Sequence, residues 1–313
     1  MRAFLFKAVL ALLILAAMHV AAAFQADGSL DEFYLRFTTP RQKSLVLGGS
    51  RAAQGIHPSL FGASDADALF EGPLYDFAFT IAHSPYGPTY LRAISAKLDS
   101  TARDGLFILQ VDPWLLGNSG HDEDGREIMP EEARTLGRMW TFNMYPNLEY
   151  LTRYHGQGWG TLGHWPMGDP DTTSELLSDG RLRMRIPMDS AAVAERTRRK
   201  IRHYAEEVLP NTSFSETRET YLARIIDLLS PHGTVLLVRF PAVRRILDME
   251  DRLDPAFDAR MERIAAGHHA HYLDVSRDAA RYTYTDGNHL DSVSGAALTR
   301  FLSYEAGRLR ALE

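Results

Sequence analysis

The sequence predicts an α/β fold in three layers, with about five parallel strands between layers of helices. Short runs rich in Val, Ile, Leu and Phe alternate with longer amphipathic stretches along most of the 313-residue chain, an order typical of α/β domains. Several of the short runs lack the polar alternation of a half-exposed strand. This favours strands buried on both faces of a parallel sheet.

The composition excludes several classes of function. With 45% hydrophobic and 24% charged residues, the chain has an ordinary globular composition. Its net charge of -6 gives no basic footprint for nucleic acid, so we expect no nucleic-acid partner. The chain has no cysteine, which excludes disulfides and a thiolate nucleophile. Catalysis would have to use Ser, His, Asp, Glu or a metal.

Residues 1–24 have the pattern of an export segment. Arg2 and Lys7 precede an almost wholly apolar run, residues 8–24, that includes three consecutive alanines near its end, as in a signal peptide. A spanning helix needs roughly 17 apolar residues or more. Membrane attachment through an uncleaved anchor is therefore the alternative. Under both interpretations the remaining chain is exported, to the periplasm or to the outer side of a membrane.

The elements are predicted in order along the chain. Residues 25–43 form a helical linker, in which Ser29 and Glu32 make a capping box for a short helix. Five strands follow, SLVLG (44–48), LYDFAF (74–79), GLFILQV (105–111), TVLLVRF (234–240) and AHYLDV (270–275). They belong to one domain, residues 44–311.

Five helices are predicted between and after these strands, at 88–103, 191–209, 213–233, 254–267 and 291–312. Ser213 with Glu216 is a second capping box. Pro255 suits a first helical position, and Gly267 a helix end. Residues 117–188 are rich in Trp and Gly and lack periodicity, so we expect an insertion over the sheet, used either for packing or for substrate binding.

Polar and glycine residues follow most of the predicted strands. They are Gly49, Ser50 and Arg51 after the first, Ser84 and Gly87 after the second, Asp112 and Asn118 after the third, and Asp286 and His289 after the last. In an open parallel sheet, ligands bind beyond the carboxyl ends of the strands. These residues are therefore candidates for a common site.

Ser50 has two interpretations. A serine at a strand-to-helix turn is most often an N-cap. It is a nucleophile if a base takes its proton. The motif differs from the G-x-S-x-G elbow because Ala52 occupies the last glycine position. Asp286 and His289 are three residues apart, so the carboxylate can orient the imidazole, as a catalytic base requires.

Together, LGGSRAAQG and TDGNHLDSVSGAALT resemble the SGNH/GDSL hydrolase superfamily, over about residues 44–311. The resemblance implies a flavodoxin-like sheet, with Ser50 as nucleophile, His289 as general base and Asp286 as its orienting carboxylate. It also implies an exported serine esterase, acyl hydrolase or O-acyltransferase that acts on ester-linked acyl groups, as on cell-surface polysaccharide. This chemistry needs no cofactor and no metal.

The sequence departs from the family pattern where the oxyanion is bound. The first block reads Gly-Gly-Ser, and the second offers Ser84 or Gly87. The third lacks Gly-x-Asn at the strand end, where the chain reads QVDPW. Asn118, Arg51, Asp112 and the backbone at Gly49 are the remaining candidates for the oxyanion or the substrate.

Two other classes of function remain open. The atypical third block and the Trp-rich insertion suit a non-catalytic glycan-binding or assembly protein on the same fold. His268, His269 and His271 could serve a metal-dependent hydrolase. The arginine-rich helix at 195–203 also contains acidic residues and is predicted to be a solvated helix face, or else a surface for acidic glycan.

Overall fold

The structure is a computed structural model that describes residues 1–24, 33–61, 69–121, 124–154 and 173–312. The proposed capping box of Ser29 and Glu32 and residues 155–172 of the predicted insertion lie outside these residues. The predicted α/β class is confirmed, with a central sheet of five parallel strands.

The sheet has the order β2-β1-β3-β8-β9. Its strands are β1 (Ser44–Leu47), β2 (Leu74–Asp76), β3 (Gly105–Val111), β8 (Gly233–Arg239) and β9 (His271–Asp274). Each adjacent pair is parallel, with Leu45 opposite Phe107 and Phe107 opposite Val235. All five lie within one residue of the predicted starts, because continuous apolar runs between turns identify buried strands well.

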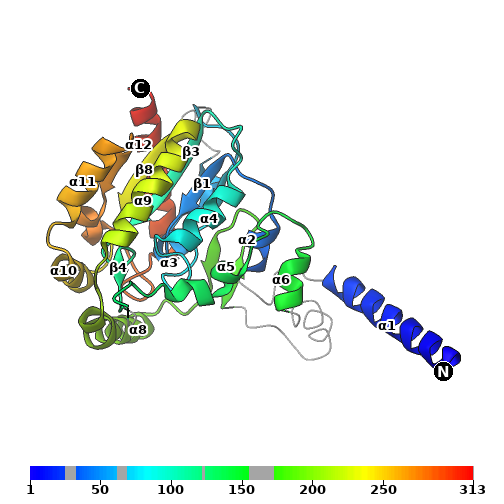
Figure 1. The fold of residues 1–313 in the computed structure, drawn as a ribbon. Coiled ribbons are helices and arrows are strands. Elements are labelled where there is room, and N and C mark those ends of the chain that lie inside the picture. The colour runs from blue at the N-terminus through cyan, green and yellow to red at the C-terminus, as the bar shows by residue number, and fades with distance from the viewer. Residues whose placement is uncertain (25–32, 62–68, 122–123, 155–172, 313) are drawn as a thin grey trace.

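Two layers of helices cover the sheet. The principal helices are α2 (Tyr34–Thr38), α3 (Ser50–Gly55), α4 (Pro88–Lys97), α5 (Thr135–Arg138), α6 (Leu148–Arg153), α8 (Ser190–His203), α9 (Glu216–Leu229), α10 (Arg244–Leu253), α11 (Phe257–Gly267) and α12 (Ser292–Arg310). Figure 1 shows α4 and α9 across one face. Helices α3 and α12 pack together on the other face.

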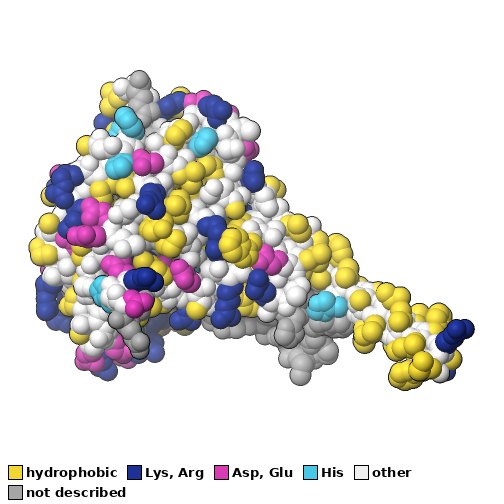
Figure 2. Space-filling model, viewed as in Figure 1, with side chains coloured by type: hydrophobic (Ala, Val, Ile, Leu, Met, Phe, Trp, Pro, Cys, Tyr) yellow, Lys and Arg dark blue, Asp and Glu magenta, His cyan; other side chains and the backbone are white. Residues whose placement is uncertain are grey.

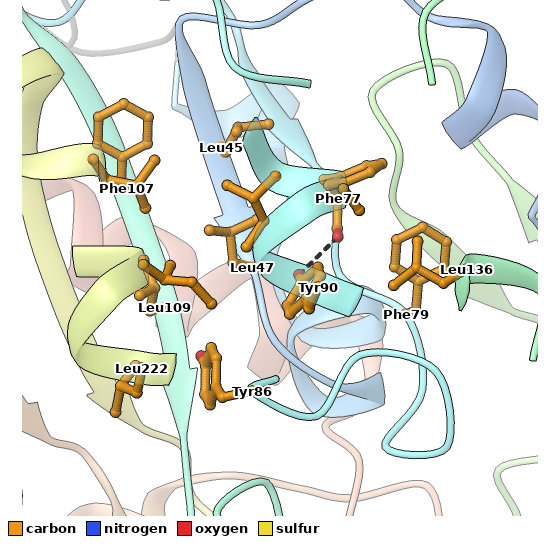
Figure 3. Close-up of a cluster of buried hydrophobic side chains, with 14 of the residues drawn as sticks. Leu45, Leu47, Phe77, Phe79, Tyr86, Tyr90, Phe107, Leu109, Leu136 and Leu222 are labelled. Atoms are coloured by element: carbon orange, nitrogen blue, oxygen red, sulfur yellow. Dashed lines mark hydrogen bonds between the residues drawn. The ribbon is translucent and has the colours of Figure 1, made fainter. Parts of the chain in front are cut away.

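Alternate residues along the strands belong to two separate hydrophobic cores, one on each face of the sheet. Leu45, Leu47 and Leu109 point into the layer of α4 and α9, where Figure 3 shows them with Tyr86 and Tyr90. Their neighbours along the strands, such as Val46 and Ile108, belong to the core under α3 and α12. Because β1 and β3 bury both faces, their backbone ends are held rigidly.

The region predicted as an insertion reaches both layers. A short strand, β4 (Gly117–Asn118), pairs with β7 (Ser213–Phe214), and α5 packs on α4. The hairpin of β5 (Ser174–Leu176) and β6 (Leu182–Met184) contacts α3 on the opposite face. The hairpin also meets the edge strand β2, since the amide of Asp76 donates to the carbonyl of Asp179 (2.9 Å).

Three predicted helix boundaries are wrong. Ser215, not Ser213, caps α9, and its hydroxyl accepts from the amide of Arg218 (3.0 Å), because Ser213 is taken up in β7. Helix α4 ends at Lys97, since Asp99 binds the amide of Thr101 (3.0 Å) in a local turn that competes with the helix. The N-cap of α11 is Ala256, so Pro255 precedes the helix.

An apolar helix, α1 (Arg2–Ala23), projects from the domain in Figure 1. It is long and apolar enough to cross a membrane, with a mean hydropathy of 2.3 over its most apolar window. Figure 2 shows hydrophobic side chains along its length and basic ones at its free end. A signal sequence and a membrane anchor share this character.

A buried lysine ties the segment after α1 to the domain. The ammonium group of Lys97 donates to the carbonyls of Arg36 (2.9 Å), Thr39 (2.7 Å) and Phe142 (2.8 Å). Burial lowers the pKa of Lys97 to about 7. One side chain thus joins α4, α2 and the chain before α6.

Candidate active site

The predicted site lies at the switch point of the sheet. From β1 the chain passes to β2 on one side, and it then returns to β3 on the other side of β1. Connections that leave two adjacent strands in opposite directions open a crevice at their carboxyl ends. The residues that follow β1 and β3 line this crevice.

Two glycines turn the chain sharply from β1 into α3. Gly48 has a φ of +134°, and a Cβ there would lie 2.5 Å from the Cβ of Gln110 on β3. A side chain at this position is therefore excluded both by conformation and by space. Gly49 is the N-cap of α3, so Ser50 is the first helical residue, and its hydroxyl is not the cap.

The hydroxyl of Ser50 faces an imidazole from the other end of the chain. Its Oγ lies 2.8 Å from Nε2 of His289, which is 239 residues away. Nδ1 of His289 lies 2.9 Å from Oδ2 of Asp286. Asp286 Oδ1 also accepts from the backbone amides of Asn288 (3.0 Å) and His289 (2.9 Å). The carboxylate is thus fixed by its own loop and holds the ring of the base.

The electrostatics keep Asp286 ionised. Burial alone would raise its pKa, but the hydrogen bonds and charge of His289 outweigh burial and hold the pKa well below the usual value. Lys200 of α8, whose Nζ lies 3.4 Å from Oδ2, acts in the same direction. An ionised Asp286 accepts a hydrogen bond from Nδ1 and leaves the Nε2 lone pair directed at Ser50.

Helix α8 lies against the loop that carries the base. Arg196 Nε donates to the carbonyl of Thr285 (2.8 Å), and a Cβ on Gly287 would lie 2.8 Å from Thr197. Gly287 has a φ of +80°, which lets the Asp286–His289 turn close. The predicted solvated helix therefore has an inner side that supports the site.

Gln110 fastens β3 to the turn after β1. Its Oε1 accepts from the amides of Gly49 (3.1 Å) and Ala52 (2.8 Å), and its Nε2 donates to Oδ2 of Asp112 (2.6 Å). Asp112 in turn accepts from the amide of Leu115 (3.0 Å). The amide of Gly49 and the carboxylate of Asp112 are therefore used within the scaffold, although both residues border the cavity at Ser50.

Arg51 belongs to a buried ionic cluster beside Ser50. Its Nη2 lies 2.6 Å from Oε1 of Glu250, and Oδ1 of Asn288 accepts from Nε (3.0 Å) and Nη2 (2.7 Å). Its Nη1 lies 3.7 Å from Asp112. Although burial opposes the charge, Glu250 and Asp112 outweigh it and raise the pKa of Arg51. The guanidinium is therefore a permanent cation under the site.

Three predicted candidates lie away from the serine. The hydroxyl of Ser84 donates to the carbonyls of Gly48 (2.6 Å) and Thr80 (3.1 Å). Gly87 is the N-cap of α4, and a Cβ on it would lie 2.8 Å from Glu131. Asn118 uses its Nδ2 on the carbonyl of Gly120 (3.0 Å). None of the three borders the cavity at Ser50.

Metal binding receives no support from the described part of the chain. There, no group of three or more His, Cys, Asp or Glu side chains is arranged to hold an ion. Within the HHAH stretch, Nδ1 of His268 lies 2.7 Å from Asp227, and His269 is in a left-handed turn with a φ of +56°. His271 begins β9.

Sequence reasoning missed Gln110, Asn288, Glu250 and Lys200. Gln110 carries a visible signal, because it is a polar side chain in an otherwise apolar strand of seven buried residues. Asn288 and Glu250 are also buried, at 3% and 0% exposure, but their partners lie far away in sequence. Such pairings become visible only when the strands are assembled.

No protein-family model matches this chain, and no curated protein matches it in sequence.

Proposed function

We propose that this protein is an exported serine esterase or O-acyltransferase of the SGNH type. The observation that carries the proposal is the chain of contacts from Ser50 through His289 to Asp286, with distances of 2.8 and 2.9 Å. This is the arrangement of nucleophile, base and orienting carboxylate that acyl transfer requires. The strand order β2-β1-β3-β8-β9 supports the finer fold proposal, since it corresponds to the flavodoxin-like order 2-1-3-4-5.

The proposed reaction begins at the hydroxyl of Ser50. His289 Nε2 removes its proton as Oγ attacks the ester carbonyl, and Asp286 stabilises the imidazolium. His289 then returns the proton to the leaving alcohol, and an acyl-enzyme remains on Ser50. Water, or a sugar hydroxyl in the transferase, attacks the acyl-enzyme with His289 again as base, which releases Ser50.

The backbone offers a first donor to the oxyanion. Ser50 is the first residue of α3, so its N–H has no acceptor within the helix. The oxyanion forms on the carbon bonded to Oγ of the same residue, which places this amide close to the developing charge.

The proposed substrate is an ester-linked acyl group, such as one on cell-surface polysaccharide. The support for this class is the family resemblance, together with the apolar helix α1, which suits an exported or membrane-attached protein. Glycan binding without catalysis is the second candidate, and the exposed Trp140, at 66% exposure, favours it as a stacking surface for sugar.

Active-site labelling with a fluorophosphonate tests the proposal. Wild type should be labelled and should hydrolyse p-nitrophenyl acetate, whereas Ser50→Ala should lose labelling and about 10⁴–10⁶-fold in kcat. Ser100→Ala is the matched control, because Ser100 is exposed in a turn away from the site. An unlabelled wild type, or equal labelling of Ser50→Ala, would overturn the proposal. Glycan binding without ester turnover would favour the second candidate.

A further inference from the structure

We propose that Asn288 supplies the side-chain N–H that stabilises the oxyanion, and that Arg51 is the positioning residue that aims it. The inference rests on the proposed serine-esterase function and deepens it. It identifies the group that replaces the asparagine missing from the end of the third strand.

The orientation of the Asn288 amide follows from its partner. Arg51 has only N–H donors, and two of them point to one atom of Asn288, at 3.0 and 2.7 Å. Only the amide oxygen can accept both bonds. The NH2 group of Asn288 must therefore face away from Arg51.

That NH2 group faces the catalytic residues. Its Nδ2 lies 3.3 Å from Nε2 of His289, the same atom that lies 2.8 Å from Ser50 Oγ. Asn288, Gly49 and Ser50 border one cavity. Because the Nε2 lone pair is directed at Ser50, the longer contact of Asn288 leaves its N–H donors for a substrate oxygen beside the bond that Ser50 forms.

The side-chain N–H donor of Asn288 is held in place before any substrate binds. Glu250 holds Arg51 (2.6 Å) and also accepts from Trp114 Nε1 (3.1 Å) and from Arg239 (3.3 Å). Asn288, Arg51 and Glu250 are 3%, 4% and 0% exposed. A buried donor held on both sides needs little reorganisation when charge develops, which is the condition for strong oxyanion stabilisation.

The other candidate side chains are already committed. Gln110 borders the cavity, but its side chain is held by Gly49, Ala52 and Asp112, whereas Asn288 is the one that contacts His289. Asn118 donates to Gly120 (3.0 Å) and does not border the cavity. Ser84 donates its hydroxyl to the carbonyl of Gly48 (2.6 Å). As the carbonyl oxygen becomes an oxyanion, it would accept from the amide of Ser50 and from Nδ2 of Asn288. Asn288 itself neither gains nor loses a proton.

Steady-state kinetics of three variants test this role. Asn288→Ala and Asn288→Asp should each lower kcat about 10²–10³-fold and leave KM within a few-fold. The aspartate keeps the size of the side chain and can still pair with Arg51, so it guards against a simple folding defect. Asn118→Ala, at the nearest asparagine after the third predicted strand, should keep wild-type kcat. Thermal melting of each variant measures any general loss of structure.

The positioning role of Arg51 needs a double-mutant cycle. Arg51→Lys keeps the charge but loses the two bonds that orient the amide, so kcat should fall while KM changes little. In the Asn288→Ala background the same change should cost nothing further, because Arg51 acts through Asn288. A further loss there would mean that Arg51 acts on the substrate directly, which overturns its assigned role.

The outcomes separate the two proposals. Suppose that wild type is labelled and active and that both Asn288 variants keep its kcat. This result would overturn the role of Asn288 and leave the esterase proposal intact. A loss confined to Asn118→Ala would do the same. Wild type that is neither labelled nor active would remove the esterase function and, with it, the oxyanion role.

Discussion

The close approach of Gly48 to Gln110 shows how single residues prepare the site. With no Cβ at Gly48, β3 can bring the Gln110 amide to the start of α3, where it binds the amides of Gly49 and Ala52. Above the glycine, Tyr90 accepts from the amide of Gly48 (3.0 Å) and donates to the carbonyl of Phe77 (2.9 Å; Figure 3). The position of Ser50 is thus set by side chains from two neighbouring segments.

At Asp286, replacing the carboxylate by an amide should disable the base. In Asp286→Asn the amide can hold His289 in the wrong tautomer, and we expect a fall in kcat of roughly 10⁴-fold with p-nitrophenyl acetate. Because the pKa of Asp286 is lowered, the native carboxylate stays ionised well below pH 4. The stability it contributes is present above its unfolded pKa, near 4, and is lost as the pH falls further.

The matched control for this variant is Asp291→Asn. Asp291 caps α12 through the amide of Ser294 (2.7 Å), and asparagine caps helices about as well. Its activity and melting temperature should remain close to those of wild type. Wild-type kcat in Asp286→Asn would contradict the assigned role of the carboxylate.

The candidate triad was accessible from sequence, whereas its supports were not. Ser50 at a strand end and Asp286-x-x-His289 before the last helix are local patterns, and the structure brings their side chains together. The partners of Arg51 are Glu250 and Asn288, 199 and 237 residues away. Ser84, Gly87 and Asn118 were expected from a family pattern, but local packing uses them elsewhere.

At the scale of elements, α3 and α12 meet around a buried histidine. The amide of His57, just after α3, donates to Thr299 of α12 (3.0 Å). A Cβ on Gly295 would lie 2.9 Å from Nε2 of this ring, so glycine makes room for it. Burial, with the charges of Arg181 and Arg300, lowers the pKa of His57 to about 4.

This buried ring should make the helix pair sensitive to acid. Between pH 6.5 and about 4 the unfolded state binds a proton at His57 that the folded state does not, so stability falls as the pH falls. From pH 7 to pH 4.5, the free energy of unfolding of His57→Gln should fall by about 1–2 kcal/mol less than that of wild type. This figure is smaller than the full pKa shift implies, because solvent screens part of the charge. Urea unfolding at pH 7 and pH 4.5 measures it.

The test compares how steeply the free energy of unfolding falls with pH in wild type and in His57→Gln, and not the stability of the two proteins at one pH. His83, whose pKa is also lowered to about 4, adds acid sensitivity of the same sign, so the variant should keep part of the wild-type slope. If the free energy of unfolding of His57→Gln falls as steeply as that of wild type, the assigned cause is wrong.

Helix ends were harder to predict than strands. The apolar runs of β1, β3 and β8 are buried on both faces, so pattern and structure coincide there. The start of α9 was misplaced because Glu216 follows Ser213 at the spacing of a capping box, whereas Arg218 stands at that distance from Ser215. Ser213 pairs with β4 as part of β7, which leaves Ser215 as the N-cap. This pairing is a tertiary contact that the local sequence does not show.

At the scale of the whole molecule, the C-terminal end of α1 indicates whether this helix is retained in the mature protein. Its apolar window is unburied, yet Ala22 and Ala23 are only 2% and 5% exposed, and Ala23 joins the main core. A helix of 22 residues is about 33 Å long, enough to span a bilayer core. Because its last two residues are buried against the domain, we expect the helix to remain as an anchor.

N-terminal sequencing and membrane fractionation of the native protein test this expectation. The full chain should resist alkaline extraction, and a chain that starts at residue 25 should be extracted while it keeps esterase activity. A mature N-terminus near residue 24 in the native protein would show that the segment is a cleaved signal.

Ser50 and His289 come from opposite ends of the sequence, 239 residues apart. A chain still emerging from the ribosome holds its nucleophile long before it holds its base. No fragment lacking the last fifty residues can contain both, however well its first strands pair. Under the proposed function, Ser50 becomes reactive only when the final loop and helix close over the sheet, so that labelling of Ser50 would also report complete folding.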